Sequence, residues 1–379
     1  MPSLLLLCEY PSLNGGEHSM LATLSRVRKA GFLPSVAAPP NGPLTEKLRS
    51  MDVKVVPFLT QDGNKKRLSQ GVLRDRLASI LKDHRPDLLH ANSLATGRLA
   101  GPVANDLKIR SIAHLRDIIK LSTQAVSDLN LNTRLIAVSN ATYSFHVKQG
   151  LNAQKTFVAY NGVDLNQFRP RPATGYLHEE LGLPNDAILI GAIGQIGIRK
   201  GLDLLSSAAV SLADRLPKAH YVVVGKRWSD KEESRRFEAD LQAVNDGTLA
   251  GRFHLVGVRT DVDKLLNELT LLVHSARQEP LGRVLLEAAS AGVAIVATDV
   301  GGTKEIFPTE CGAATLVPPN NATPLADAIY ELVKKNDRQA KLAVAARRRA
   351  EKTFDIELTT ARLIEHYRQV IDANSPLEP

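Results

Sequence analysis

The sequence predicts an α/β protein made of two doubly wound parallel-sheet domains. With 379 residues, the chain exceeds one ordinary hydrophobic core, so two domains of about 170 to 200 residues are expected. Short apolar runs alternate with helical stretches in both halves, which is typical of parallel strands covered by helices. Between the halves the chain turns at Asn161-Gly162 and then has little apolar periodicity before Glu179, which predicts a domain boundary in this region.

The composition is that of a soluble globular protein, with 44% apolar and 23% charged residues. No segment approaches the length of a membrane span, and the run Leu4 to Leu7 is too short for a signal peptide and follows no basic segment. We therefore expect a cytoplasmic protein. Cys8 and Cys311 are the only cysteines, so neither a disulfide framework nor a thiolate metal site is predicted.

The net charge of +8 is compatible with anionic partners such as nucleotide sugars, anionic lipid surfaces or nucleic acid. Nucleic acid is the weakest of these, because aromatic residues make up only 4% of the chain and do not alternate with basic ones. No nucleic-acid partner is predicted.

The first half begins with a strand at Ser3 to Tyr10, followed by Gly15 and Gly16 and a helix from Ser19 to Ala30. Flexible glycine amides at the carboxyl edge of a parallel sheet predict a ligand loop; a plain tight turn is the alternative. The further strands of this half are expected at Pro34 to Ala38, Val53 to Phe58, Asp87 to Ala91, Ser111 to His114 and Leu135 to Val138.

A helix from about Leu68 to His84 follows three basic residues, Lys65, Lys66 and Arg67. This combination could contact an anionic membrane or a lipid-phosphate acceptor. The favoured interpretation is a core-facing helix with a solvated entry loop.

In the second half, the strand Ala187 to Gly194 leads to Arg199 and Lys200 and then to a helix from Leu202 to Leu216. Two cations at a strand-to-helix junction can neutralise a departing diphosphate. The glycines here do not have the dinucleotide-binding spacing G-x-G-x-x-G, which argues against a dinucleotide cofactor. Gly225, which ends the strand Tyr221 to Val224, is expected near the same ligand.

The most informative stretch is Glu279 to Gly302. A helix is expected from Leu281 to Ala291, and the free N–H groups of its first turn, from Gly282 through Arg283 and Val284 to Leu285, would form an anion site. Glu279 precedes this helix.

Glu287 lies one turn further along the helix, where a carboxylate can grip a vicinal diol such as a ribose. A ligand with a sugar, a diphosphate and a ribose would satisfy Glu279, the helix amides and Glu287.

Two glutamates spaced E-x7-E, with AxxAG closing the helix and Thr298, Gly301, Gly302 and Glu305 beyond it, resemble the donor-site signature of retaining glycosyltransferases of family 4. The resemblance implies the GT-B fold, in which two Rossmann-like doubly wound domains face a central cleft. It is supported by the linker NGVD at Asn161 to Asp164, similar to that of the family.

By this resemblance we expect residues 1–170 to bind the acceptor, residues 171–355 to bind a nucleotide sugar, and residues 356–379 to form a helix that crosses back to the first domain. The residues expected to act in catalysis are His114, Glu279, Arg199 and Lys200. The residues expected to bind substrate are Gly15, Gly16, Gly225, Val258, Leu281, Gly282, Arg283, Val284 and Glu287.

His114 corresponds to the histidine that hydrogen-bonds the transferred sugar in this family, and the backbone of Val258 to the one that reads the base. Arg116 and Asp117 are expected to border the acceptor pocket. Gln195 stands where the family usually has an arginine, so Arg199 and Lys200 would carry the phosphate contacts.

The expected activity is hexosyl transfer with retention from a nucleoside diphosphate sugar, most commonly a UDP-sugar in the family, to a glycan or lipid-linked acceptor. Asp261 and Asp263 form a D-x-D sequence, but their place at a helix start favours capping over metal binding. Neither a metal nor a cofactor is predicted. The alternative functions are a sugar-nucleotide epimerase or hydrolase and a non-catalytic sugar-nucleotide-binding scaffold. The alternative to a purely cytoplasmic location is a peripheral position at the inner face of the membrane.

Overall fold

A computed structural model describes residues 1–64 and 66–372 and divides the chain into two compact units. The first unit contains Met1–Gly162 together with the segment that starts at Ile356, and the second contains Val163–Asp355. The division between the units therefore precedes the sequence-based boundary at residues 170 and 171. Lys65 of the predicted basic loop and residues 373–379 of the predicted last segment lie outside the described residues.

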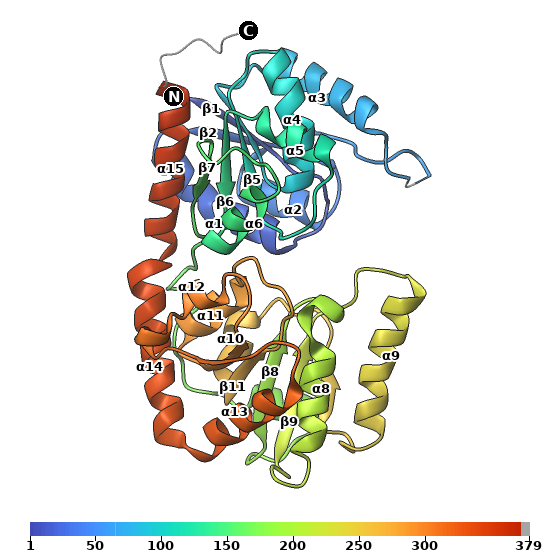
Figure 1. Cartoon of the computed structure of the whole chain (residues 1–379), viewed down its shortest axis with the longest axis vertical. Helices are drawn as coiled ribbons and strands as arrows, with labels where there is room; N and C mark the ends of the chain where they lie inside the picture. Colours follow the sequence, from blue (N-terminus) through green and yellow to red (C-terminus); the bar gives the residue numbers. More distant parts are fainter. Residues whose placement is uncertain (65, 373–379) are drawn as a thin grey trace. The chain divides into compact units, whose positions relative to one another are not determined.

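The first unit is built on a seven-stranded parallel sheet with the strand order β3-β2-β1-β4-β5-β6-β7 (Figure 1). Its strands are β1 (Ser3–Leu7), β2 (Leu33–Ala38), β3 (Lys54–Pro57), β4 (Leu88–Ala91), β5 (Ser111–Leu115), β6 (Arg134–Ala137) and β7 (Thr156–Val158). Its helices are α1 (Gly15–Lys29), α2 (Pro43–Ser50), α3 (Gln70–His84), α4 (Leu94–Asp106), α5 (Thr123–Asn130), α6 (Asn140–Val147) and α15 (Ile356–Asp372).

Helices cover both faces of this sheet. Leu4 and Leu6 of β1 pack into a core with α1, α2 and α15, whereas Leu5 and Leu7 pack into a second core with α3, α4 and α5. Successive side chains of a strand point to opposite faces, so the unbroken leucine run is that of a strand buried on both sides.

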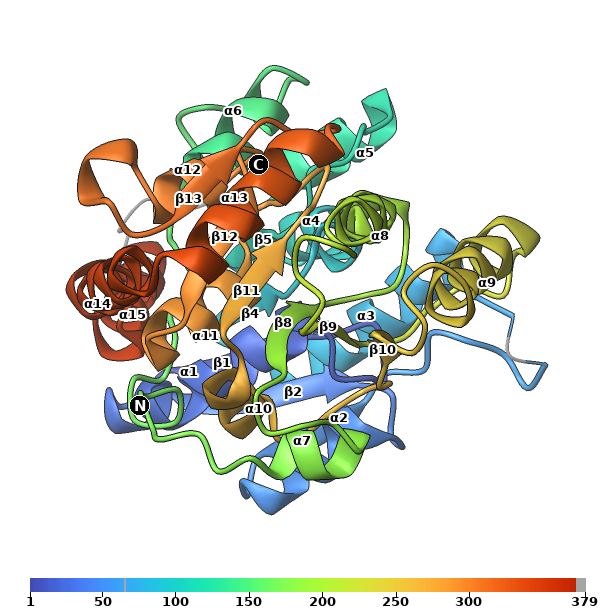
Figure 2. The same cartoon turned by 90° about the horizontal axis from the view of Figure 1, so that it is seen from below.

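The second unit has a six-stranded parallel sheet with the order β10-β9-β8-β11-β12-β13. Its strands are β8 (Ile188–Ile193), β9 (Ala219–Val224), β10 (Phe253–Leu255), β11 (Leu271–His274), β12 (Ala294–Thr298) and β13 (Thr315–Val317). Its helices are α7 (Tyr176–Leu181), α8 (Leu202–Ser211), α9 (Glu232–Asp246), α10 (Val262–Glu268), α11 (Arg283–Ala291), α12 (Thr303–Ile306), α13 (Ala322–Lys334) and α14 (Asn336–Thr353). Helices α8, α9 and α13 lie on one face of the sheet, and α10 and α11 lie on the other (Figure 2).

Each sheet reverses its strand order at one point: between β1 and β4 in the first unit and between β8 and β11 in the second. Loops leave the carboxyl ends of these neighbouring strands toward opposite faces, which opens a crevice where ligands bind in doubly wound sheets. The loops after β1, β4, β8 and β11 are therefore where chemistry is expected.

Four sequence-based boundaries are wrong. Strand β1 ends at Leu7, ahead of the predicted Tyr10. Helix α1 begins at Gly15, because Asn14 and Glu17 form a capping box, so the glycine pair belongs to the first helical turn instead of a loop before Ser19. Helix α11 begins at Arg283, because Gly282 has a left-handed φ of +102° and so leaves Leu281 in the loop. Helix α8 ends at Ser211, ahead of the predicted Leu216. Strands β11 and β13 were not predicted.

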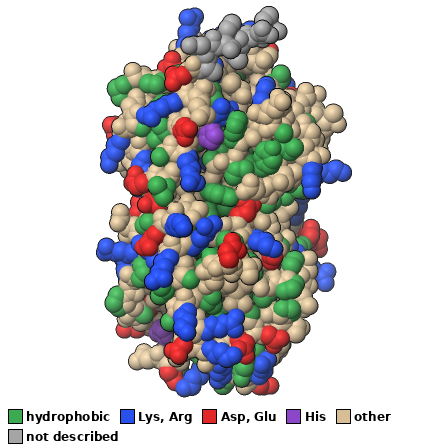
Figure 3. Space-filling model, turned by 60° about the vertical axis from the view of Figure 1, so that its left-hand side comes forward, with side chains coloured by type: hydrophobic (Ala, Val, Ile, Leu, Met, Phe, Trp, Pro, Cys, Tyr) green, Lys and Arg blue, Asp and Glu red, His purple; other side chains and the backbone are tan. Residues whose placement is uncertain are grey.

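Helix α3 directs its apolar stripe into the core, where Leu73, Leu77 and Leu81 are buried. The core-facing interpretation of this helix is thus confirmed. Arg67 pairs with the buried Glu9 at 2.8 Å. Within the described ranges, no helix is both long and apolar enough to cross a membrane. Figure 3 shows one face of the molecule, on which Lys and Arg side chains are dispersed among Asp and Glu side chains.

Candidate active site

The first group of site residues lies at the carboxyl edge of the second sheet. Lys200 ends a 3₁₀ turn (Ile198–Lys200) after β8, and Glu279 lies in the loop between β11 and α11. The Lys200 Nζ donates to Glu279 Oε2 over 2.5 Å. His274, the last residue of β11, donates from Nε2 to the same oxygen over 2.9 Å. The loops from the two strands at the switch point therefore meet through one buried carboxylate.

The Glu279 carboxylate is ionised. Burial opposes a charge on this residue, which is only 6% exposed, but the Lys200 ammonium and the hydrogen bond from His274 outweigh burial and hold the pKa of Glu279 well below its usual range. Burial lowers the pKa of His274 despite its hydrogen bond to Glu279, so its imidazole is neutral. The result is a fixed carboxylate that can accept hydrogen bonds from sugar hydroxyls.

Arg277 fixes the loop that carries Lys200. Its guanidinium donates to both carboxylate oxygens of Asp203, over 2.7 and 2.6 Å, and to the carbonyl of Ile198 over 2.9 Å. Its backbone N–H donates to the carbonyl of Arg199 over 2.8 Å. A bidentate arginine pair adds geometric specificity to the charge attraction, so the position of Lys200 depends on Arg277.

The paired glycines after β12 form the wall behind Glu279. Gly301 has a φ of +52°, and a Cβ there would overlap the carbonyl oxygen of Glu279. The N–H of Gly302 donates to that same oxygen over 2.9 Å. Glycine is required here because the two backbones touch, which gives the Gly301-Gly302 pair a physical role in positioning the acid.

The start of α11 provides a smaller anion site than the sequence suggested. The N–H of Leu285 donates back to the carbonyl of Gly282 over 3.0 Å, which leaves the amides of Gly282, Arg283 and Val284 for a phosphate. A Cβ on Gly282 would come within 2.7 Å of the Leu285 side chain. Leu281, in the preceding loop, is buried.

Glu287 lies one turn into α11 and is 8% exposed. It accepts a hydrogen bond from Arg283 Nε over 2.6 Å. The Nη1 of Arg283 is buried and has no hydrogen-bond partner within the described part of the chain. The pair thus holds an ordered carboxylate next to an unsatisfied donor, a combination suited to a ligand that carries both hydroxyl and phosphate groups.

A cavity of about 260 Å³ lies between the loop after β8 and helix α9. Gln195, Arg199 and Lys200 line it from the loop, and Ser234 and Phe237 line it from the helix. Both predicted cations line this cavity, but Lys200 also donates a hydrogen bond to Glu279, whereas the Arg199 side chain is exposed.

Gly225 ends β9 with a φ of +140°, and a Cβ there would overlap the carbonyl oxygen of Gly194. Its N–H donates to Gly257 over 2.7 Å, so Gly225 serves close backbone approach and has no N–H left for a ligand. Val258 follows Gly257 at the same sheet edge and is 60% exposed.

The carboxylates of Asp261 and Asp263 are held by different cations. Asp261 accepts from Arg259 and from the Tyr176 hydroxyl, each over 2.9 Å, and Asp263 accepts from Arg171 over 2.9 Å. Asp261 occupies the cap position of α10, but its side chain makes no capping hydrogen bond. The predicted capping role is therefore wrong for the side chain, which joins an ion-pair network instead.

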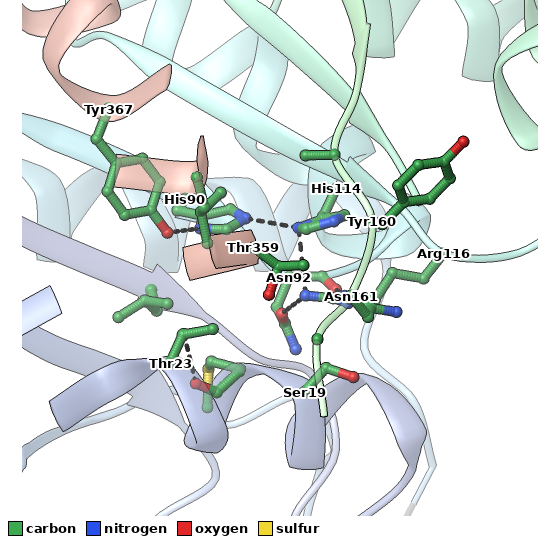
Figure 4. A pocket seen from close by; sticks show the side chains of 15 residues that line it. Ser19, Thr23, His90, Asn92, His114, Arg116, Tyr160, Asn161, Thr359 and Tyr367 are labelled. Carbon is green, nitrogen blue, oxygen red and sulfur yellow. Dashed lines mark hydrogen bonds between the residues drawn. The ribbon is translucent and has the colours of Figure 1, made fainter. Parts of the chain in front are cut away.

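The second group of site residues lies at the carboxyl edge of the first sheet (Figure 4). His114 on β5 is 3% exposed and lines a small cavity. Its Nδ1 lies 3.2 Å from His90 Nε2 and 3.2 Å from Arg116 Nη2, and its Nε2 has no hydrogen-bond partner among the described residues. Burial first, and the charge of Arg116 second, hold the pKa of His114 well below its usual range. His114 is therefore a neutral imidazole.

Arg116 is held by neutral groups. Its guanidinium donates to the backbone and side-chain oxygens of Asn92, each over 2.9 Å, and to Asn161 Oδ1 over 2.9 Å. Burial lowers the pKa of Arg116 to about 10, so it remains charged at neutral pH. Gly16 of the predicted ligand loop lies beside Arg116, and a Cβ on Gly16 would lie only 3.2 Å from Arg116 Cδ. Gly15 has open space around it. The structure thus brings His114, Arg116 and Gly16 together.

Two family descriptions match the chain, "Glycosyltransferase Family 4" over residues 13–167 and "Glycosyl transferases group 1" over residues 176–349. The chain belongs to glycosyltransferase family 4. One relative of this glycosyltransferase is spore coat protein SA of Bacillus subtilis (strain 168), with 26% identity over 57% of this chain and 59% of that protein. The alignment thus spans about three fifths of that relative's length.

A further relative is the UDP-Gal:alpha-D-GlcNAc-diphosphoundecaprenol alpha-1,3-galactosyltransferase of Escherichia coli, with 23% identity over 79% of this chain and 80% of that protein. Among solved structures, the crystal structure of Anabaena HepE in complex with UDP-glucose superposes with a TM-score of 0.85, at 22% identity over 97% of this chain and all of that one. The predicted GT-B fold of two Rossmann-like domains is confirmed.

Several residues at the two sites of this glycosyltransferase were missed from the sequence. His274 ends a strand of only four residues, and the polar residue after an apolar run was its only signal. Arg277 and Tyr367 act through partners far away in the chain: the Tyr367 hydroxyl contacts His90 Nδ1, 277 positions earlier. The sequence contained no local pattern for such pairs.

Proposed function

We propose that this glycosyltransferase transfers a hexosyl group from a UDP-sugar to a hydroxyl of a glycan or lipid-linked acceptor, with retention of configuration at the anomeric carbon. The observation that carries the proposal is the buried cluster of Lys200, Glu279 and His274 beside the start of α11. It offers a cation and helix amides for a diphosphate and a fixed carboxylate for a sugar.

In the proposed reaction, the bond between the anomeric carbon and the diphosphate oxygen breaks, and a bond to the acceptor oxygen forms on the same face of the sugar. The acceptor proton passes to the departing phosphate oxygen. Lys200, Arg199 and the amides of Gly282, Arg283 and Val284 stabilise the negative charge that develops on that phosphate.

The other residues orient the donor. Glu279 accepts hydrogen bonds from sugar hydroxyls, and Glu287 binds the ribose. His114 donates a hydrogen bond to the transferred sugar. Gly225 allows the ligand to approach the sheet edge, and the backbone of Val258 contacts the base. Gly15 and Gly16, in the first turn of α1, would lie under the phosphates.

We further propose that the reaction needs neither a metal ion nor a cofactor. The two carboxylates of the D-x-D sequence are each engaged by arginine, which supports this assignment. Neutralisation of the diphosphate would come from Lys200, Arg199 and the helix amides.

The choice of donor and acceptor rests on the relatives. The neighbouring structure contains UDP-glucose, and one relative is described as transferring galactose to a diphosphoundecaprenol-linked sugar. A contact with an anionic membrane remains a prediction. Since α3 buries its apolar stripe, Lys66 and Arg67 would make that contact, and cosedimentation with phosphatidylglycerol vesicles at two salt concentrations would test it.

The test is nucleoside diphosphate release from a panel of UDP-, GDP- and ADP-sugars, with and without glycan and polyprenyl-diphosphate-sugar acceptors. We expect release that depends on the acceptor, resists EDTA, and gives a product with the donor's anomeric configuration by NMR. Release without an acceptor would indicate the hydrolase alternative, and conversion of the donor into another nucleotide sugar without net release would indicate the epimerase alternative. Binding of the nucleotide sugar without any turnover would indicate a scaffold.

A further inference from the structure

Three buried side chains, Tyr367, His90 and His114, form a chain of hydrogen bonds inside the first unit (Figure 4). Tyr367 comes from the last described helix, α15, whereas His90 and His114 come from the neighbouring strands β4 and β5. The Tyr367 hydroxyl lies 2.6 Å from His90 Nδ1, and His90 Nε2 lies 3.2 Å from His114 Nδ1. Each of the three residues is at most 3% exposed.

The position of every proton in this chain follows from Arg116. An arginine N–H can only donate, so the contact of 3.2 Å between Arg116 Nη2 and His114 Nδ1 requires a lone pair on that nitrogen. His114 is then neutral and carries its proton on Nε2. Its Nδ1 cannot donate to His90, so His90 Nε2 must be the donor between the two rings.

The same logic fixes the other end. A neutral His90 with its proton on Nε2 has a lone pair on Nδ1, and so the Tyr367 hydroxyl must donate to it. Burial lowers the pKa of His90 to about 3 and raises the pKa of Tyr367, which keeps both groups neutral. All three hydrogen bonds thus run toward His114 Nδ1, whose single lone pair is shared by the donors of His90 and Arg116, each 3.2 Å away.

This arrangement of protons leaves one hydrogen-bond donor, the His114 Nε2–H, without an acceptor in this chain of hydrogen bonds. The Nε2–H of His114 is buried and has no partner among residues 1–64 and 66–372, although leaving a buried donor unpaired is normally unfavourable. Such a group is expected where a ligand supplies the missing acceptor. An oxygen of a bound sugar or phosphate has the required lone pair.

We propose that Tyr367 and His90 are positioning residues, which hold His114 in the tautomer and orientation that present its Nε2–H to an acceptor oxygen of the substrate. The proposal rests on the proposed function for its kinetic consequence, but not for its structural claim. Tyr367 and His90 do not touch the substrate. Helix α15 therefore contributes to the site as well as to the core of the first unit.

The rings also restrain one another by packing. His90 and His114 stack with centroids 5.4 Å apart and an interplanar angle of 20°, and Tyr367 meets His90 edge-on at 5.5 Å. The charged or titratable groups that face His114 are Arg116, His90 and, at longer range, His366. A purely packing role for Tyr367 would survive the loss of its hydroxyl, which makes that atom the one to remove.

The experiment reads the tautomers directly by two-bond ¹H–¹⁵N correlation spectra of the full chain labelled with ¹⁵N-histidine. Signals are assigned with His114→Gln and His90→Gln variants. We expect His114 to show a protonated Nε2 and a bare Nδ1. His146, whose Nε2 donates to the carbonyl of Asp117 over 2.7 Å, serves as an internal reference outside the chain of hydrogen bonds.

The Tyr367→Phe variant should let His90 sample both tautomers, shift the His114 signals, and lower kcat/KM about three- to tenfold, as expected for the loss of one oriented hydrogen bond. His90→Leu should have a larger effect than His90→Gln, because the glutamine amide can accept from Tyr367 and donate to His114. The matched control is Tyr221→Phe: this hydroxyl is also buried but has no partner among the described residues, so neither spectrum nor rate should change.

A wild-type His114 that carries its proton on Nδ1, or on both nitrogens at neutral pH, would overturn the proposal. So would Tyr367→Phe and His90→Leu variants whose His114 signals and kcat/KM match the wild type. If the wild type transfers no sugar from any donor, the proposed function fails, and the tautomer spectra still decide the proton order.

Discussion

Replacing Glu279 by glutamine should separate the stability role of this residue from its role in the reaction. The substitution keeps the shape and leaves an oxygen for His274, but it removes the anion that faces the Lys200 ammonium at 2.5 Å. Breaking a buried pair by removing one partner costs about 3–5 kcal/mol. Because the Lys200 side chain is 17% exposed, water recovers part of this, and we expect a loss of about 2–3 kcal/mol in the free energy of unfolding.

The catalytic effect should be larger than the effect on folding. Loss of one preorganised electrostatic contact to the reacting sugar typically lowers kcat about 10²- to 10³-fold. We expect this reduction for Glu279→Gln at donor concentrations above KM, measured as initial rates of nucleoside diphosphate release. Unfolding in urea, monitored by circular dichroism, gives the change in the free energy of unfolding for the same preparation.

The matched control is Glu268→Gln in the same unit. Glu268 is also 6% exposed, but its carboxylate accepts from Thr174 and the amide of Gly175, at 2.7–2.9 Å, and forms no ion pair with the described residues 1–64 and 66–372. Its variant should lose stability and keep kcat. If Glu279→Gln retained wild-type kcat, or if both variants lost activity in parallel with stability, the assignment of Glu279 to the reaction would be wrong.

A double variant tests the pair itself. Replacing Lys200 by methionine in the Glu279→Gln background removes the uncompensated ammonium, and an apolar replacement for a buried pair is often neutral for stability. The double variant should therefore recover most of the lost unfolding free energy and none of the activity. Additive losses in stability would show that Lys200 and Glu279 do not interact as described.

Three further outcomes are expected. The pKa of His90 falls to about 3 in the folded chain, so the contribution of His90 to the free energy of unfolding is fully present above its ordinary pKa of about 6.5 and declines as the pH falls below it. Between pH 7.5 and 5 this residue should lower the free energy of unfolding by about 2 kcal/mol. An equal drop in the His90→Gln variant would contradict this. Gly301→Ala should displace Glu279 and cost about 2 kcal/mol and most of kcat, whereas Gly312→Ala, at a similar φ of +54° with open space around it, should retain activity by the same assay. Arg277→Gln should weaken UDP binding about tenfold in calorimetry by freeing the loop after β8, and an unchanged affinity would exclude that role.

The fold was largely predictable because its main signals are local. A run such as Leu4 to Leu7 can only be buried on both sides, and a chain that alternates such runs with amphipathic stretches has few topologies open to it. The strands that were missed, β11 and β13, have four and three residues. Such short apolar runs do not differ from a helix fragment in periodicity alone.

Helix α1 shows how a correct signal can be overruled by a stronger one. Gly15 and Gly16 indicate a loop by propensity, since glycine destabilises helices. Yet the Asn14 side chain and Glu17 satisfy the free amides of the first turn from both directions, and this capping box was legible in the sequence. The cap defines the start of α1, and it places the backbone of Gly16 beside Arg116.

The position of the site in the second unit follows from the point where the strand order reverses. Lys200 and Glu279 could be assigned to one ligand because each follows a strand or precedes a helix at the carboxyl edge of a parallel sheet, where the strand order decides which loops meet. The order itself requires β11, so the sequence alone could not show that His274 reaches the same Glu279 oxygen as Lys200. The short strand was therefore the missing piece of both the fold and the site.

Tyr367 sets the limit of what a single sequence can show. Its spacing from Leu363, Ile364 and Val370 on α15 predicts an apolar face, and that face does pack into the core of the first unit. Within such a stripe a tyrosine is chosen for its ring unless its hydroxyl finds a partner. The partner is His90, at a separation of 277 residues, and the consequence appears at His114, which Tyr367 does not touch. A residue that conveys orientation through a second residue leaves no spacing pattern, so only the structure connects the end of the chain to the chemistry at the sheet edge.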